Sequence, residues 1–206
     1  MAEDTIQKLD ALKIPCIACT KCRLSETRTN VVFGEGDPNS PLVIVGEGPG
    51  ANEDATGRPF VGRSGALLDE CLAACKIHRK QVFICNVVKC RACESENGRF
   101  RNRPPAPDEV IACTPWLQQQ MEIMKPLVIL SLGAPSAKFI IKSDFAITKE
   151  RGIFFPTAYA RTAIAAFHPS YILRKMNIPN DDSKSLLIAD IEAARRKVIE
   201  IKKELS

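Results

Sequence analysis

Four short segments of this chain are apolar at almost every position, and segments with apolar residues at helical spacing lie between them. The four have the sequences PLVIVGE, QVFICNVVKC, PLVILSLG and RTAIAAFHPS. A strand without polar alternation is buried on both faces, as in a parallel sheet that helices cover on each side. The sequence therefore predicts a three-layer α/β/α sandwich.

Helices and surface loops complete this pattern. Pro107, Asp108 and Glu109 are typical of a helix N-terminus. The last predicted helix is amphipathic and has a basic outer face. The predicted helices cover residues 64–77, 106–125, 134–141 and 183–205, and the predicted surface loops cover residues 93–107 and 175–184.

Length and charge limit the possible classes of protein. The chain has 206 residues, so we expect one domain spanning residues 1–206. Its formal net charge of +5 is mild and does not identify a polyanionic partner by itself. No apolar run approaches the roughly eighteen residues of a membrane span. Residues 1–15 contain acidic residues and no long apolar core, unlike a targeting signal, so we expect a cytoplasmic protein.

The spacing of the cysteines favours a metal site. The chain has nine of them, and an odd number without a secretory signal argues against a disulfide framework. Cys16, Cys19 and Cys22 form two overlapping C-x-x-C units, and the distant Cys90 pairs with either Cys93 or Cys113. One C-x-x-C pair with two distant cysteines, for example Cys19 and Cys22 with Cys90 and Cys113, makes a set of four thiolates. Zinc and a cubane iron–sulfur cluster both accept such a set, so the spacing leaves both open.

The other five cysteines fall into two groups. Cys71, Cys75 and Cys85 lie in apolar helical or strand segments, and we expect them to be buried thiols. Cys16 and Cys93 are each three residues from a cysteine of the first set, and either could replace a ligand.

Residues suited to binding and catalysis follow three of the four predicted strands. Ligands of an open α/β sheet bind beyond the carboxyl ends of its strands. Glycines there let a ligand approach backbone N–H groups, carboxylates can act as acids or bases, and an asparagine amide both donates and accepts hydrogen bonds. The residues are Gly46, Glu47, Gly48, Gly50, Glu53, Asp54, Asn86 and His168.

Each of these signals is weak when it is taken alone. A glycine–proline turn, a solvated acidic loop and a structural histidine would account for them separately. The glycines match neither the dinucleotide fingerprint G-x-G-x-x-G nor the P-loop, so a nucleotide cofactor loses its main support. Their common position at strand ends, facing one crevice, favours a binding site.

Four motifs in this order closely resemble the family 4, iron–sulfur uracil-DNA glycosylases. They are CTKCRLSETRTNVVFGEG, GEGPGANEDATGRPFVGRSG, NVVKC and HPSYILR, and the resemblance spans residues 19–174. It implies an α/β/α fold with a four-stranded parallel sheet and excision of uracil from DNA to leave an abasic site. It also implies a [4Fe–4S] cluster held by Cys19, Cys22, Cys90 and Cys113.

The resemblance also implies a pocket for a uracil that has been flipped out of the base stack. Phe60 would stack on the uracil ring. The amide of Asn86 would hydrogen-bond to N3–H and O4, and cytosine, with donor and acceptor reversed, would fit it poorly. Backbone groups around Gly46 and Gly48 would hold the O2 side.

Three residues would carry the chemistry. Glu47 would position water and stabilise the positive charge that develops on the sugar. His168 would donate to uracil O2 as the base departs. Glu53 would be a second carboxylate that assists the water, shields the pocket from the methyl group of thymine, or orders the loop by hydrogen bonding.

DNA contacts are implied at two places. Residues 170–173 would form a loop that wedges into the base stack, although its apolar residues could equally anchor it to the core. Arg63 and Ser64 lie at a predicted helix start, which would bind phosphate. In the first place the residues are Ser170, Tyr171, Ile172 and Leu173, with Arg174 and Lys175 as phosphate contacts.

The chain departs from the family pattern between the third and fourth cluster cysteines. Typical members have a shorter segment there, whereas here residues 91–112 intervene and Cys93 replaces a proline-like position. This leaves open whether Arg99, Arg101 and Arg103 reach the DNA.

We expect a monomer that acts on uracil-containing DNA, single- or double-stranded, without a membrane partner. The sequence does not show whether a sliding clamp is a partner. A glycosylase for other deaminated bases is one alternative. A non-catalytic nucleic-acid-binding module stapled by metal is another, and it would explain the cysteines. It would not explain Glu47, Phe60, Asn86 and His168 together.

Overall fold

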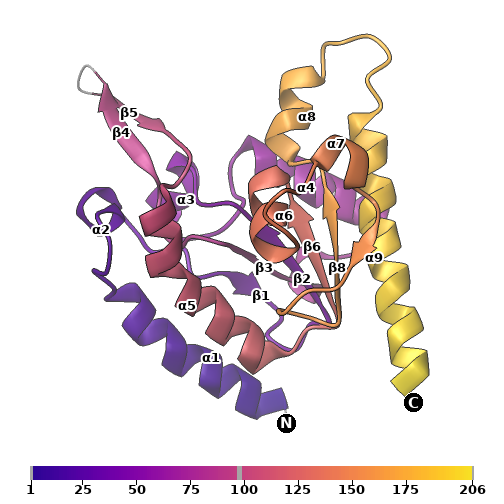
Figure 1. Cartoon of the computed structure of the whole chain (residues 1–206), viewed down its shortest axis with the longest axis horizontal. Coiled ribbons are helices and arrows are strands. Elements are labelled where there is room, and N and C mark those ends of the chain that lie inside the picture. Colours follow the sequence, from indigo (N-terminus) through magenta and orange to yellow (C-terminus); the bar gives the residue numbers. More distant parts are fainter. Residues whose placement is uncertain (1, 97–98, 206) are drawn as a thin grey trace.

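The computed structural model describes residues 2–96 and 99–205. Within these ranges the main sheet has six strands in the order β1-β3-β2-β6-β8-β7 (Figure 1). The four central strands are parallel, and each outer strand pairs antiparallel with its neighbour. The strands are β1 Glu35–Gly36, β2 Leu42–Gly46, β3 Phe83–Asn86, β6 Val128–Leu132, β7 Phe154–Phe155 and β8 Thr162–Ala166.

The predicted four-stranded parallel sheet is confirmed as the centre of this sheet. The structure adds β1 and β7, which are only two residues long and therefore show no alternation that a sequence pattern could reveal. The predicted loop at residues 93–107 contains a further two-stranded hairpin of β4 (Cys93–Glu96) and β5 (Arg99–Asn102). In Figure 1 this hairpin projects from the body of the molecule beside α3.

The predicted helices are confirmed as α4, α5, α6 and α9, with ends that differ by a few residues. The structure adds an N-terminal helix, α1, which packs along α5 (Figure 1). It also adds short helices within predicted loops. The helices are α1 Ala2–Ile17, α2 Leu24–Thr27, α3 Ala51–Thr56, α4 Arg63–Ala74, α5 Pro107–Met124, α6 Ala134–Ile140, α7 Ile147–Glu150, α8 Pro169–Lys175, α9 Ser183–Leu205 and the 3-10 turn η1 Arg79–Gln81.

The sheet separates two hydrophobic cores because successive side chains of a strand point to opposite faces. On β2, Leu42 and Ile44 pack toward α4, α8 and α9, whereas Val43 and Val45 pack toward α1, α5 and α6. Both faces are therefore covered by helices, as the apolar strands predict.

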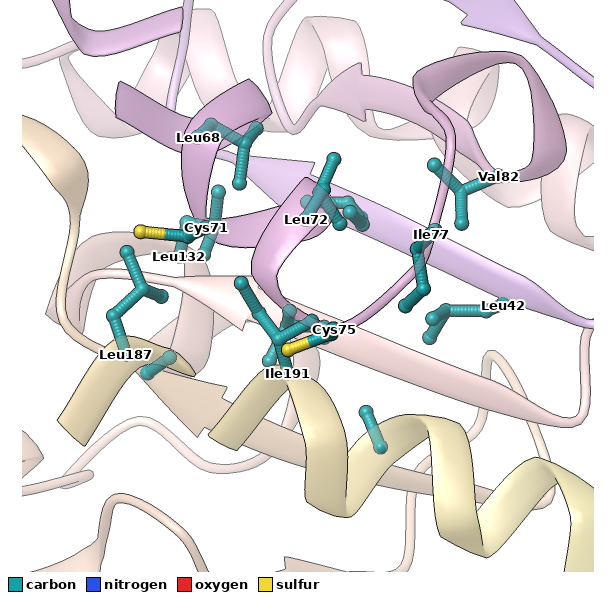
Figure 2. Packing of buried hydrophobic residues seen from close by; sticks show 14 of the residues in the cluster. Leu42, Leu68, Cys71, Leu72, Cys75, Ile77, Val82, Leu132, Leu187 and Ile191 are labelled. Atoms are coloured by element: carbon teal, nitrogen blue, oxygen red, sulfur yellow. The ribbon is translucent and has the colours of Figure 1, made fainter. Parts of the chain in front are cut away.

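Figure 2 shows the first of these cores between α4 and α9. Cys71 of α4 and Cys75, the residue directly after this helix, lie among leucine and isoleucine side chains, including Leu187 and Ile191 of α9. Cys71 and Cys85 are fully buried and Cys75 is 5% exposed, so the prediction that these three are buried thiols is confirmed.

Among the described helices, none combines the length and the apolar character that crossing a bilayer requires.

Candidate active site

A cavity of about 440 Å³ lies beyond the carboxyl ends of β2, β3 and β8. The predicted crevice therefore exists, and most of the predicted site residues line it. They come from the β2–α3 loop, α3, the α3–α4 loop, the start of α4, the end of β3 and the start of α8. They are Glu47, Gly48, Gly50, Glu53, Phe60, Arg63, Ser64, Asn86, His168 and Ser170, joined by Asn102 at the end of β5 and by Arg103 directly after it.

Gly46, Asn86 and Phe60 meet at the base of this cavity. Gly46 is the register partner of Asn86 across β2 and β3. A Cβ atom at Gly46 would lie 2.4 Å from Asn86 Oδ1 and 2.6 Å from Phe60 Cζ, so only glycine allows the amide and the ring to approach this strand end. Asn86 is 2% exposed, and its side-chain amide has no hydrogen-bond partner in the described part of the chain. The amide therefore faces the cavity with both polar atoms uncommitted.

The loop that carries Phe60 is held in an unusual conformation. Phe60 has φ of +50°, in the left-handed region that bulky residues rarely adopt. The guanidinium of Arg79 donates to the carbonyl oxygens of Pro59 and Phe60, the latter at 3.1 Å. A Cβ at Gly65 of α4 would lie 1.8 Å from the Phe60 carbonyl oxygen, so glycine is required for this close approach. The ring of Phe60 lies 5.7 Å from that of His168.

Glu47 directly follows β2 and is half-buried at the cavity wall. In the described ranges of the chain, no hydrogen-bond donor or cation contacts its carboxylate. Burial alone raises the pKa of this carboxyl above its ordinary value. A carboxylate placed this way has free lone pairs and a strong tendency to bind a proton, a water molecule or a positive charge.

His168 caps the N-terminus of α8. The backbone N–H of Ser170 donates to Nδ1 of the imidazole at 3.0 Å, and the Ser170 hydroxyl lies 2.7 Å from the same nitrogen. Because an N–H can only donate, Nδ1 carries a lone pair and the proton of the neutral ring is on Nε2. Burial, helped by the charge of Arg174, lowers the pKa of His168 to about 4. The ring is therefore a neutral N–H donor at neutral pH.

Glu53 uses its carboxylate to hold the surrounding loops. It accepts hydrogen bonds from the backbone N–H of Gly50 at 3.1 Å, of Val61 at 3.0 Å and of Gly62 at 3.1 Å. These contacts join the start of α3 to the segment that follows Phe60. The geometry favours the loop-ordering alternative for Glu53.

A second cavity of about 380 Å³ adjoins the first and shares Glu47, His168 and Ser170 with it. Tyr171 and Arg174 also line it. The loop conformation predicted for residues 170–173 is wrong, because these residues form part of α8. Pro169 occupies the first helical position, where proline starts a helix rather than interrupts it.

The apolar residues of α8 anchor it to the protein. Ile172 is 2% exposed in the core, and Leu173 and Tyr171 pack against the same core. The Tyr171 ring also stacks on Phe167 at 4.9 Å. The polar residues Ser170 and Arg174 remain beside the cavities.

The predicted metal cysteines surround a separate small cavity. Cys19, Cys22, Cys90 and Cys113 line it, and so does Cys16. Cys93 lies outside it, with its thiol 3.7 Å from the hydroxyl of Thr27.

Polar groups approach two of these sulfur atoms. Arg28 donates to Cys90 Sγ at 3.4 Å, and the backbone N–H of Lys89 donates to Cys113 Sγ at 3.2 Å. Burial raises the pKa of the Cys113 thiol to about 11. Nowhere in the described residues do three or more histidine, cysteine or acidic side chains converge on a position for a single metal ion.

Sequence reasoning missed three residues that shape the site. Arg79 gave no signal, because the carbonyl groups that it holds lie about twenty residues away in the sequence. Lys89 interrupts an apolar run, which was a usable signal; its ammonium is fully buried against the Asn86 carbonyl and Gln120. Asn102 reaches the cavity only because of the hairpin.

The sequence model of the uracil DNA glycosylase superfamily matches residues 33–192, which include the whole main sheet and the cavity residues. The chain therefore belongs to the uracil DNA glycosylase superfamily. A type-4 uracil-DNA glycosylase of Thermotoga maritima is 45% identical over 86% of this chain and 88% of the relative. Type-4 uracil-DNA glycosylases of Sulfurisphaera tokodaii (40% identical; 84% and 79% covered) and Archaeoglobus fulgidus (37%; 82% and 84%) are also similar. Within the superfamily, the chain is a member of the type-4 family.

Proposed function

We propose that this protein is a DNA repair enzyme that hydrolyses the N-glycosidic bond of uracil in DNA, releasing uracil and leaving an abasic site. The observation that carries the proposal is the set of side chains that line one cavity. They are a carboxylate without a hydrogen-bond partner among the described residues, a neutral imidazole, an amide whose two polar atoms are free to bind a ligand, and an aromatic ring. These belong to Glu47, His168, Asn86 and Phe60. The four groups match what a glycosylase must do with a flipped base.

Base recognition falls to Asn86 and Phe60. The Asn86 carbonyl oxygen accepts from uracil N3–H and its NH₂ group donates to O4, while the Phe60 ring stacks on the base. Cytosine presents an acceptor at N3 and a donor at C4, so it would leave both amide atoms unpaired in a buried site. The tight packing of Gly46 against both residues fixes the amide and the ring relative to each other.

His168 stabilises the leaving base. As the glycosidic bond breaks, negative charge gathers on uracil O2, and the Nε2–H group donates a hydrogen bond to it. The ring is already neutral, so it acts as a fixed dipole and does not have to lose a proton.

Glu47 stabilises the other product of bond cleavage, the sugar cation. Its carboxylate lies in the wall shared by the two cavities, and it also orients the attacking water and accepts its proton. Its raised pKa suits a base that must bind a proton during the reaction. We propose that Glu53 acts as a positioning residue for the Phe60 loop.

DNA is the partner, and we propose contacts at two places on the cavity rim. Arg63 and Ser64, at the N-terminus of α4, bind one phosphate. Ser170 and Arg174 of α8 bind another, with Tyr171 beside them. We further propose that the protein acts as a monomer in the cytoplasm, where it meets chromosomal DNA.

The cysteine cavity is proposed to hold a [4Fe–4S] cluster through Cys19, Cys22, Cys90 and Cys113. The donor set fits this group, because the four thiolates of a cubane each bind a different iron and so surround a volume instead of converging on one point. The hydrogen bonds from Arg28 and from the Lys89 backbone would stabilise thiolate charge in a place where burial otherwise disfavours it. The cluster would cross-link the segments that carry these cysteines. Cys16 lines the same cavity as a fifth thiol.

The test is excision from a single-uracil oligonucleotide, with alkaline cleavage of the abasic product and a thymine oligonucleotide as the negative control. The wild-type protein is expected to cleave only the uracil strand, and Glu47→Gln to reduce the rate by about 100-fold or more. Glu122→Gln, an exposed change on α5, should leave the rate unchanged.

The Glu47→Gln variant should also have a melting temperature a few degrees above that of the wild type, because it removes a charge that burial disfavours.

Two results would contradict this proposal. Normal excision by Glu47→Gln would remove the assigned carboxylate from the mechanism. Absence of uracil excision by folded wild-type protein would reject the activity and favour a role in binding.

A further inference from the structure

The hairpin of β4 and β5 has two unlike faces. Cross-strand pairing sets Cys93 opposite Asn102 and Ser95 opposite Phe100. These four side chains share one face because alternate residues of a strand point the same way. The other face carries the opposed pairs Glu94 with Arg101 and Glu96 with Arg99.

The face with Phe100 is the one that borders the active-site cavity. Asn102 lines that cavity, and Cys93 is buried against the body of the protein. Phe100, two residues before Asn102 on the same face, is 55% exposed. The hairpin therefore presents an aromatic ring to solvent two residues away from a side chain that lines the cavity.

The described part of the hairpin is held firmly at its base. The guanidinium of Arg91 donates to Asn102 Oδ1 at 2.7 Å and to the Phe100 carbonyl oxygen at 3.3 Å. Arg103 forms an ion pair with the fully buried carboxylate of Glu109 at 2.6 Å. These contacts fix the backbone of Phe100 relative to the cavity.

The opposite face does not repel a polyanion. Arg101 pairs with Glu96 at 2.8 Å, a diagonal cross-strand contact, so the two acidic residues are balanced by arginines. Counting the flanking Arg91 as well, three arginines accompany two glutamates in this segment, and Arg103 is paired with Glu109. The hairpin is therefore compatible with lying along a nucleic-acid backbone.

The spacing suits a nucleobase close to the flipped uracil. Two residues of a strand advance about 6.6 Å. Successive bases of one DNA strand are about 3.4 Å apart, so Phe100 lies roughly two nucleotides from the part of the rim that Asn102 lines. Exposed aromatic rings beside a nucleic-acid site stack on bases without regard to sequence.

We propose that Phe100 stacks on a DNA base beyond the part of the cavity rim that Asn102 lines, and that the β4–β5 hairpin is a DNA-contacting element of this chain. The inference rests on the proposed function, since it presumes uracil-containing DNA in the neighbouring cavity. Its contribution is to binding, and Phe100 takes no part in bond cleavage.

The test compares steady-state excision by wild-type protein, Phe100→Ala, Phe100→Leu and Phe100→Trp on a single-uracil oligonucleotide. Phe100→Ala and Phe100→Leu are expected to raise KM about tenfold with little change in kcat, because base stacking is lost. Phe100→Trp should stay within about twofold of wild type. Ile111→Ala, a truncation of another exposed apolar side chain, on α5, is the matched control and should change neither parameter.

Shortened substrates locate the contact. One oligonucleotide is truncated beside the uracil on its 5′ side, and the other is truncated on its 3′ side. Only one of the two lacks the base on which Phe100 stacks. The difference between wild type and Phe100→Ala should vanish on one of them and persist on the other.

Three results would overturn the inference. The first is an equal KM for Phe100→Ala and the wild type, and the second is a KM of Phe100→Ala that stays above the wild-type value on both truncated substrates. The third is a wild-type KM for Phe100→Leu as well as for Phe100→Trp. If the wild-type protein excises no uracil, the proposed function fails separately. The stacking inference is then decided by the dissociation constants of the same variants for an oligonucleotide with a tetrahydrofuran abasic analogue. Phe100→Ala and Phe100→Leu are expected to bind it more weakly than the wild type, and Phe100→Trp is expected to bind it about equally.

Discussion

At the scale of single residues, the site depends on which groups keep their charge and which do not. Glu47 and His168 line the same cavity, yet burial acts on them in opposite directions, raising the pKa of the acid and lowering that of the imidazole. Both shifts favour the neutral form in the empty cavity. The proposed reaction creates a positive sugar and a negative base, and in our proposal Glu47 faces the first and His168 faces the second.

The state of His168 gives a direct prediction. Its imidazole signals in a proton–nitrogen NMR titration should change with a midpoint near pH 4, with Nε2 carrying the proton at neutral pH. The chain has two histidines, so a His168→Gln variant assigns the signals. A midpoint for His168 between pH 6 and 7 would contradict the neutral-donor role.

The same shift has a consequence for stability. The folded-state pKa is about 4 and the ordinary value is 6.5, so between these values the unfolded chain binds the proton more readily. The His168 contribution to the free energy of unfolding is therefore lost as the pH falls from about 6.5 to 4. The His168→Gln variant should lose less stability over this window than the wild type does.

Residue roles were only partly predictable from the sequence. The grouping of Glu47, Asn86 and His168 followed from strand ends, because parallel strands deliver their last residues to one edge. The contacts of Glu53 could not be predicted, since its partners are backbone N–H groups of residues that it meets only after the loop folds. Arg79 was missed for the same reason.

At the scale of elements, the active site depends on how the Phe60 loop meets α4. The left-handed conformation of Phe60 is strained, and the Arg79 guanidinium and the absence of a side chain at Gly65 allow it to persist. The ring position is thus set by two neighbouring elements, η1 and α4, and by the loop itself.

Gly65 provides the prediction at this scale. Glycine-to-alanine changes inside a helix usually stabilise it, but here the added Cβ would overlap the Phe60 carbonyl oxygen. Gly65→Ala should therefore lower the free energy of unfolding in urea by about 3 kcal/mol. Ser64→Ala, one residue earlier in the same helix, should change it by less than about 0.5 kcal/mol. Equal or greater stability of Gly65→Ala would show that the loop adapts without penalty.

The elements themselves divide by the strength of their periodicity. Apolar strands and long amphipathic helices were predictable because burial imposes a repeat on them. The hairpin was not, since Cys93–Glu96 and Arg99–Asn102 are mostly polar and exposed. The residues of α8 were predicted as a loop because their apolar members follow a proline and no repeat can be recognised in so short a segment.

At the scale of the whole molecule, the cysteine cavity brings together segments that are far apart in the sequence. Cys19 and Cys22 follow α1, Cys90 follows β3, and Cys113 lies within α5. Nearby, the buried Glu109 carboxylate binds both Arg23 and Arg103, and Arg103 holds its pKa down to about 2. The sequence predicted the four cysteines as a set, but not that Cys16 would join the lining and Cys93 would not.

The proposed cluster can be tested with two matched variants. Wild-type protein is expected to show a broad visible absorbance band, which a zinc protein would lack. Cys90→Ser should lose this band and lower Tm by about 10 °C, because metal binding contributes directly to folding free energy. Cys93→Ser, in the same segment but outside the cavity, should keep both. Loss of the band in Cys93→Ser alone would require a different ligand set.

The two-sided attachment of the β4–β5 hairpin bears on how such a chain can change during evolution. The segment leaves the body after Cys90 and returns at Arg103, which binds the Glu109 carboxylate, and the backbone N–H of Arg103 donates to the Ala92 carbonyl at 3.0 Å, so the two ends of the segment are joined at its base. Residues inserted or deleted in pairs between β4 and β5 would lengthen or shorten this segment, and longer surface loops carry only a small entropic penalty. The length of the hairpin can thus change without any change to the main sheet, the active-site cavity or the cysteines that line the second site.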